Sequence, residues 1–246
     1  MTYGQGRIYC DADSHIMETL DWVSKHADES IKDRLPGLAL GGAGKSAEKV
    51  ITRAVERLKD SEKTAEIDHD VIAGPKGWEA YGAFDKAERR KALDDMGFHK
   101  QLVFSTFSAT QYLSSNDMDI LYGGIRAHNR AMADFCSGDP RMIAVAQVAL
   151  NDTARALEEI EYALELGCGA FWMPASPAGD RSPGHIDLDP VWDRLAKAKT
   201  PFLLHVGAGL RIMHKAYENN GRPLPLDRLG GGENLRVKDY VTLSFA

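Results

Sequence analysis

MIAVAQVALNDTARALEEIEYALELGCGAFWM, residues 142–173, has the pattern of a strand, a helix and a second strand. The apolar runs 142–148 and 169–173 have the length of buried strands. Between them, Asp152 occupies a position typical of a helix N-cap, and Gly167 stands where a helix typically ends. A strand, a crossover helix and a second strand of this length form a βαβ unit, in which the two strands are parallel.

The same plan recurs on both sides of this segment. Further apolar runs predict three more strands, at Arg7–Asp11, Gln101–Ser105 and Pro201–Val206. The boundary signals of the other predicted helices are Asp85 with Glu88 as a capping pair, Gly97 as a stop, a start near Asp117, and Asp189 as an N-cap before Pro190. The sequence therefore predicts an α/β fold with five parallel strands and about five βα units.

The connection between the first and second predicted strands is much longer than an ordinary βα loop. It contains an insertion at about residues 19–81, with an amphipathic helix around Val50–Leu58. An insertion of this length predicts a helical cap or a dimer contact. We expect residues 1–246 to form one domain that carries this insertion.

The composition is that of an ordinary globular protein. The 30 basic and 36 acidic residues are mixed along the chain and give a formal net charge of −6. Because there is no basic stripe, nucleic acid is not an expected partner. No run approaches the roughly 18 apolar residues that span a bilayer, so we predict a cytoplasmic protein without membrane contact. The three cysteines are widely separated, which favours free thiols over a disulfide or a thiolate zinc site.

The ends of two predicted strands carry the strongest chemical signal. Asp13 and His15 follow the first strand, and alternate residues of a strand share a face. His205 interrupts an apolar run near its C-terminal end, where parallel α/β sheets place functional residues. A carboxylate and two imidazoles are ligands for a divalent ion. The alternatives are a hydrogen-bonded Asp–His pair at a strand end and a core histidine bonded to the backbone.

Two further residues near these strand ends are candidates for the site. Arg211 lies shortly after His205 and is suited to meet an anionic substrate group or to form a surface salt bridge. Glu18 is either a partner that orients an imidazole or a residue at a helix start. No Gly-x-Ser-x-Gly elbow is present, and no cysteine has a neighbouring base, so nucleophilic acyl transfer is disfavoured.

Three stretches together resemble the amidohydrolase-related family. They are DADSHIME at 11–18, HNRAMADFC at 128–136 with DPR at 139–141, and DPVW at 189–192 leading to LHVG at 204–207. The chain is similar nearly end to end to the aminocarboxymuconate-semialdehyde decarboxylase-like branch of the amidohydrolase superfamily.

This resemblance implies a (β/α)8 TIM-type barrel that holds one divalent ion, zinc or manganese, at the C-terminal ends of its strands. Asp13 and His15 match the family's ligand pair on the first strand. His205 matches the ligand on the fifth strand and is the candidate catalytic residue. The family often has His-x-His in the first pair, so Asp13 changes the charge of the site.

The family continues with three more βα units, which carry a further histidine and a final-strand aspartate. The sequence contains neither, so we expect a barrel that is truncated at its C-terminus or divergent. Such a barrel has an open sheet edge, which favours a homo-oligomer or another partner chain.

These residues predict a metal-dependent hydrolase that acts on a small carboxylated or cyclic substrate through metal-activated water. Two alternatives remain open. One is a metal-dependent non-oxidative decarboxylase of an aromatic or muconate-type acid, and the other is an inactive barrel that serves as a binding or interaction module. A nucleotide-binding doubly wound sheet is disfavoured because no Gly-x-Gly-x-x-Gly follows a predicted strand.

Overall fold

The sheet contains five parallel strands in chain order. They are β1 (Tyr9–His15), β2 (Phe98–Phe104), β3 (Met142–Gln147), β4 (Ala170–Trp172) and β5 (Phe202–Leu203). The computed structural model describes residues 5–40, 44–68, 77–108, 111–113, 115–174 and 184–205. The predicted α/β class and all five predicted strands are confirmed.

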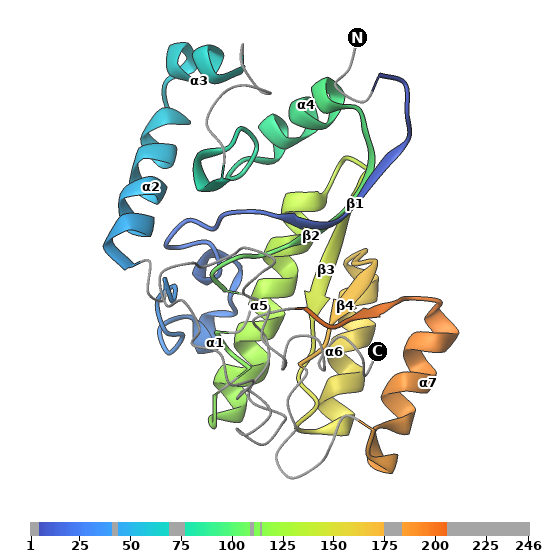
Figure 1. Ribbon diagram of the computed structural model, residues 1–246. Helices are drawn as coiled ribbons and strands as arrows, with labels where there is room; N and C mark the ends of the chain where they lie inside the picture. Colours follow the sequence, from blue (N-terminus) through green and yellow to red (C-terminus); the bar gives the residue numbers. More distant parts are fainter. Residues whose placement is uncertain are drawn as a thin grey trace, which may run out of the picture.

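The sequential order of the strands explains why the sheet curls. Connections between parallel strands are right-handed as a rule, so an order without reversal puts the crossover helices on one side. Helices α5, α6 and α7 lie along that side of the sheet (Figure 1). A doubly wound sheet would reverse its order and carry helices on both faces. The strands therefore form part of a TIM-type barrel, and the other face of the sheet is the barrel interior.

The helices next to the sheet are α4 (Lys86–Met96), α5 (Met118–Cys136), α6 (Thr153–Glu165) and α7 (Asp189–Ala198). The first three begin where the sequence predicts. The side chains of Asp85, Asp117 and Asp152 each accept hydrogen bonds from backbone N–H groups in the first turn. Gly97 follows α4 in the left-handed region, with φ of 79°. These caps confirm the boundary signals at three of the four helices.

Glu88 does not complete the predicted capping pair with Asp85. Its Oε2 atom accepts hydrogen bonds from Arg57 Nη2 at 2.8 Å and from Gly82 N at 3.2 Å. A buried carboxylate is stabilised more by a guanidinium than by one backbone N–H, which explains why the side chain turns to Arg57. The resulting ion pair joins the insertion to α4.

Two other predicted boundaries are wrong. Asp189 is the first residue of α7 rather than its N-cap, because the short 3-10 helix η4 (Ile186–Leu188) runs directly into α7. The first strand begins later than the predicted 7–11 and continues to His15. This longer strand includes both candidate ligands near its end.

The insertion after β1 contains more helix than predicted. Its elements are η1 (Ser24–His26), α1 (Glu29–Lys32), α2 (Gly44–Arg57), α3 (Ser61–Asp68) and η3 (Gly77–Glu79). The predicted amphipathic helix is α2, which buries Ala47, Ile51 and Ala54. Figure 1 shows α2 and α3 away from the crossover helices, whereas α1 lies beside α5.

Apolar side chains pack on both faces of the sheet. A large cluster includes Ile160, Phe171 and Leu195 and fills the space between the sheet and the helices. Phe104 and Trp172 belong to a separate, smaller cluster, and they alternate along their strands with residues of the larger cluster. The smaller cluster therefore faces the barrel interior.

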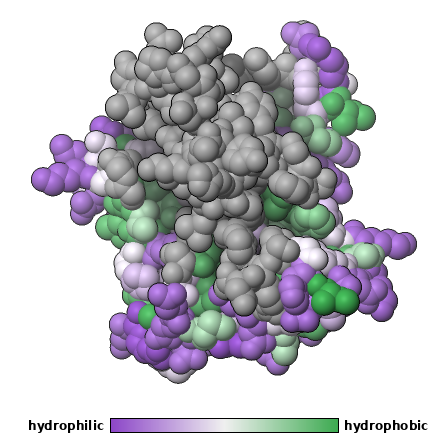
Figure 2. Space-filling model, turned by 60° about the horizontal axis from the view of Figure 1, so that its bottom comes forward, coloured by the Kyte–Doolittle hydropathy of each residue, from purple (hydrophilic) through white to green (hydrophobic). Residues whose placement is uncertain are grey.

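Hydrophilic residues dominate the coloured rim of the face in Figure 2. The exposed large apolar side chains belong to separate parts of the chain: Ile8, Leu20, Ile186 and Phe202. None of the described helices combines the length and the apolar character needed to cross a membrane.

Candidate metal centre

A β-bulge in β1 directs the candidate ligands. Asp11 pairs with Gln101 of β2 and Ser14 with Val103, so β1 has one extra residue between these pairs. The carboxylate of Asp11 accepts a hydrogen bond from Gln101 Nε2 at 3.4 Å, on the helix side of the sheet. The bulge then turns Asp13 towards the barrel interior, together with His15. Strict alternation would place Asp11, Asp13 and His15 on one face of the strand. The bulge between Asp11 and Ser14 explains why Asp11 lies on the other face.

Arg89 of α4 holds the end of β1 from the helix side. Its guanidinium donates hydrogen bonds to Ser14 Oγ at 2.8 Å and to the carbonyl oxygen of His15 at 2.6 Å. Its Nε donates to the carbonyl oxygen of Gly82 at 2.7 Å. Burial lowers the pKa of Arg89, which is only 8% exposed. The contacts fix the backbone that carries His15.

Asp13, His15 and His205 form one cluster at the C-terminal ends of β1 and β5. Asp13 Oδ1 lies 2.8 Å from His205 Nε2 and 3.3 Å from His15 Nε2, and the two Nε2 atoms are 3.3 Å apart. Ligands about 2.05 Å from a tetrahedral ion would be separated by about 3.3 Å. The three donor atoms thus have spacings close to three corners of a zinc-type tetrahedron. A carboxylate and two imidazoles also suit manganese.

The hydrogen bonds of His15 favour the tautomer that a metal needs. Its Nδ1 lies 3.0 Å from the carbonyl oxygen of Ser105, which only accepts hydrogen bonds. Nδ1 must therefore carry the proton, and the lone pair of Nε2 points at the cluster. Thr106 Oγ1 is 3.3 Å from the same Nδ1 and donates its own proton to the carbonyl oxygen of Ile16 at 2.7 Å.

Aromatic rings surround the two histidines. The ring of His205 lies 4.8 Å from that of Trp172 and 5.0 Å from that of Phe104, measured between centroids. The ring of His15 stacks on Phe104 at 5.6 Å. Within the described part of the chain, two buried polar atoms nearby have no hydrogen-bond partner: Trp172 Nε1 and Gln147 Oε1. These residues are register partners on β4 and β3.

His128 lies in a buried polar network behind the site. Its Nε2 accepts hydrogen bonds from Ser105 Oγ at 2.9 Å and from Gln147 Nε2 at 3.2 Å, and its Nδ1 donates to Asn129 Oδ1 at 3.2 Å. The side chain of Asn129 also exchanges two hydrogen bonds with the backbone of Gln147. Burial lowers the pKa of His128 to about 4. The neutral imidazole thus connects Ser105 of the β2 end to α5 and β3.

We expect His128 to make the protein less stable in acid. The unfolded chain takes up a proton near pH 6.5, whereas the folded protein does so only near pH 4. The free energy of unfolding should therefore fall by about 2–3 kcal/mol as the pH drops from 6.5 to 4, and the contribution of this group should level off below pH 4. The free energy of unfolding, measured with urea, should fall less between pH 7.5 and 4.5 in His128→Gln than in wild type. Equal losses would contradict the expectation, and His99→Gln, at an exposed histidine on β2, is the control.

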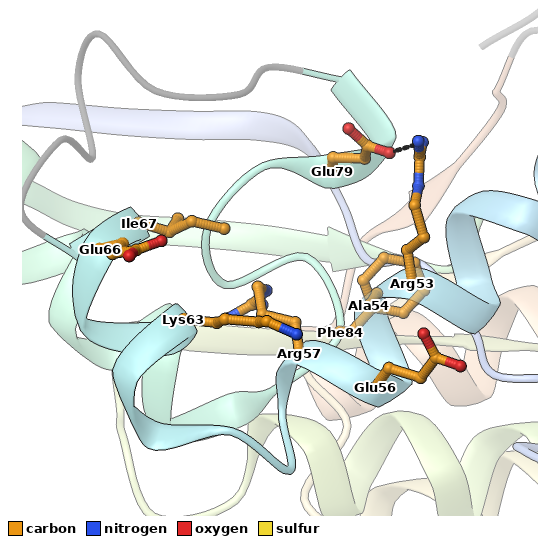
Figure 3. A pocket seen from close by; sticks show the side chains of 9 residues that line it. All are labelled: Arg53, Ala54, Glu56, Arg57, Lys63, Glu66, Ile67, Glu79 and Phe84. Atoms are coloured by element: carbon orange, nitrogen blue, oxygen red, sulfur yellow. Dashed lines mark hydrogen bonds and ion pairs between the residues drawn. The ribbon is translucent and has the colours of Figure 1, made fainter.

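A separate cleft of about 380 Å³ lies in the insertion between α2, α3 and η3 (Figure 3). Its cationic side chains all have carboxylate partners: Arg53 with Glu79, Arg57 with Glu88, and Lys63 with Asp60. The cleft shares no described residue with the metal cluster. It therefore gives no support to a second site for an anionic substrate.

The structure brings together the three predicted ligands but does not test every predicted site residue. Arg211 lies outside the described residues. Glu18 does not start a helix, and within the described parts of the chain its carboxylate binds the segment after β2 rather than an imidazole. Sequence reasoning missed Ser105, Thr106 and Arg89. Backbone carbonyls carry no residue signal, and Arg89 lies in a helix whose sequence is largely polar.

Comparisons with known proteins agree with this architecture. A family model described as Amidohydrolase matches residues 108–231. A solved amidohydrolase from Mycobacterium avium subsp. paratuberculosis K-10 is 21% identical, with a TM-score of 0.61 over 80% of this chain and 58% of that chain. The structure of 2,6-dihydroxybenzoate decarboxylase complexed with 2,6-dihydroxybenzoate is 23% identical, with a TM-score of 0.45 over 57% of this chain and 46% of that chain. No curated protein matches the sequence.

The two kinds of match support different conclusions. At 21% identity, the likeness to the mycobacterial protein supports the fold, and the chain spans 58% of that protein's length. The family match covers half of this chain, including the second and third of these sequence stretches, and confirms the resemblance. The chain belongs to the amidohydrolase family.

Proposed function

We propose that the protein is a metal-dependent hydrolase that acts on a small carboxylated or cyclic substrate. The observation that carries the proposal is the convergence of Asp13, His15 and His205 at the C-terminal ends of β1 and β5. These three residues would hold one zinc or manganese ion. When bound, such an ion acts as a Lewis acid and lowers the pKa of its water from 15.7 towards about 7.

The protein's own residues have distinct parts in this proposal. His15, with its proton on Nδ1, offers Nε2 to the ion, and Asp13 supplies negative charge. His205 lies against the rings of Trp172 and Phe104, which would hold a flat cyclic substrate next to the cluster. Trp172 Nε1–H and Gln147 Oε1 are a buried donor and a buried acceptor that polar groups of a deeply bound substrate would satisfy. Arg211 is proposed, from its sequence position, to meet an anionic group.

A non-oxidative decarboxylase is the second candidate. The aromatic rings around His205 favour it as well, because they suit an aromatic or otherwise unsaturated acid. An interaction module without catalysis is the third, and it predicts a folded protein without turnover. The proposed partners are a small-molecule substrate and further copies of the same chain.

The test begins with elemental analysis of the protein purified without chelators. We expect about one zinc or manganese ion per chain. The loaded protein is then assayed against lactones, cyclic amides and esters for hydrolysis, and against aromatic acids for release of carbon dioxide. Hydrolysis that chelation abolishes supports the proposal. Carbon dioxide release without hydrolysis supports the second candidate, and a folded protein that binds no metal contradicts both.

A further inference from the structure

Glu18 is a completely buried carboxylate in the segment that follows β1. Its Oε1 accepts hydrogen bonds from Thr106 N at 3.2 Å, Ser108 N at 2.7 Å and Ser108 Oγ at 2.7 Å. Its Oε2 accepts one from Phe107 N at 3.0 Å. Burial raises the pKa of Glu18, and the hydrogen bonds from Ser108 and Phe107 oppose this rise. Three successive backbone N–H groups therefore surround one buried carboxylate.

These N–H groups belong to the segment that holds the ring of His15. β2 ends at Phe104, so residues 106–108 have no strand partners for their N–H groups. Ser105, immediately before this segment, supplies the carbonyl oxygen that binds His15 Nδ1. Thr106 supplies the hydroxyl oxygen next to the same nitrogen. Glu18 thus fixes the backbone from which both contacts to His15 arise.

No ion pair in the described part of the chain involves Glu18. A buried carboxylate that only helps stability would ordinarily have a cation as partner, as Glu159 has in Arg126 at 2.6 Å. Glu18 instead uses its hydrogen-bonding capacity on one short segment at the mouth of the barrel. That segment also packs on the insertion, where the rings of Phe107 and Trp78 lie 5.6 Å apart.

We propose that Glu18 is a positioning residue of the metal centre, which holds residues 106–108 and thereby fixes the ring and the tautomer of His15. This inference rests on the proposed metal centre. Groups that orient a ligand imidazole typically change metal affinity by about 10–100-fold when they are replaced. Glu18 would act indirectly, because the backbone of Ser105 and the hydroxyl of Thr106 lie between it and the imidazole of His15.

Glu18→Gln tests the inference directly. The amide keeps the side-chain shape but places a donor against Phe107 N–H, so the segment can no longer be held by both oxygen atoms. We expect zinc to bind the folded variant about 10–100-fold more weakly than wild type, measured by competition with a chromophoric chelator. We also expect a changed visible spectrum of the cobalt-loaded protein, because the geometry at His15 is altered.

Glu159→Gln is the matched control. It makes the same substitution at another buried glutamate, which is 4% exposed and lies on α6 outside the cluster. It should lower the stability of the protein and leave zinc affinity and the cobalt spectrum unchanged. A folded Glu18→Gln with wild-type zinc affinity and cobalt spectrum would overturn the inference. If Glu18→Gln does not fold, Thr106→Val replaces it as the test of the inference. This variant removes the hydroxyl next to His15 Nδ1 and should weaken zinc binding at least several-fold.

Imidazole nitrogen NMR spectra of the metal-free protein separate this inference from the proposed function. We expect one tautomer of His15 in wild type, with the proton on Nδ1, and a mixture of tautomers in Glu18→Gln. This comparison holds even if wild type binds no metal, a result that would contradict the proposed function. The same single tautomer in both proteins would overturn the role of Glu18.

Discussion

His205→Ala is expected to remove the metal from the protein almost completely. The variant loses one of three donor atoms, which lie within 4.8 Å of one another in the cluster. Replacing a group that only orients a ligand costs about 10–100-fold in affinity, so loss of a ligand should cost on the order of 1000-fold. Metal content, measured by elemental analysis after dialysis, should fall from about one ion per chain to near zero.

The control for this experiment is His99→Ala. His99 is an exposed histidine on β2 outside the cluster, so its removal tests whether any loss of imidazole lowers the metal content. It should leave one ion per chain. His15→Ala should lose its metal to the same extent as His205→Ala. Retention of a full complement of metal by both cluster variants, with circular dichroism showing a native fold, would refute the proposed ligand set.

Asn129→Ala is expected to lower the free energy of unfolding by about 2–6 kcal/mol. The side-chain amide of Asn129 is fully buried, and it binds both the N–H and the carbonyl oxygen of Gln147, at 2.7 and 2.9 Å. Alanine leaves these two buried backbone groups without partners, and each such group costs about 1–3 kcal/mol. Urea unfolding followed by circular dichroism measures the change.

An exposed asparagine is the control for this variant. Asn116→Ala alters an exposed residue and should change the free energy of unfolding by no more than about 0.5 kcal/mol. Asn129→Asp gives a second comparison, because it keeps one acceptor but loses the donor to the carbonyl oxygen of Gln147. A stability loss below about 1 kcal/mol in Asn129→Ala would show that the two backbone groups find other partners.

The strands and most helix boundaries could be predicted because their causes are local. Five short apolar runs mark the strands, and the carboxylates of Asp85, Asp117 and Asp152 cap the helices within one turn. Such signals depend only on neighbours in sequence. The prediction of Asp189 as a cap is wrong by one residue, because η4 continues directly into α7.

The three candidate ligands could be predicted from their positions at strand ends, but their surroundings could not. The bulge in β1 depends on its register with β2, which no local pattern specifies. The supports of His15 are a carbonyl oxygen of Ser105 and a hydroxyl of Thr106, some 90 residues away in the chain. Arg89 is buried only because α4 packs behind β1. Tertiary contacts of this kind leave no trace in residue spacing.

The cluster also has a topological consequence, since it joins two distant points of the polymer. His15 and His205 are 190 positions apart, so an ion held by both closes a loop that contains most of the chain. Closing a loop of that length costs about 4–5 kcal/mol of chain entropy. Before β2, β3 and β4 assemble, the binding free energy of the ion alone would have to offset this loss of chain entropy. In the folded sheet the cost has already been met, and the ion then acts as a reversible cross-link between the first strand and the last described strand.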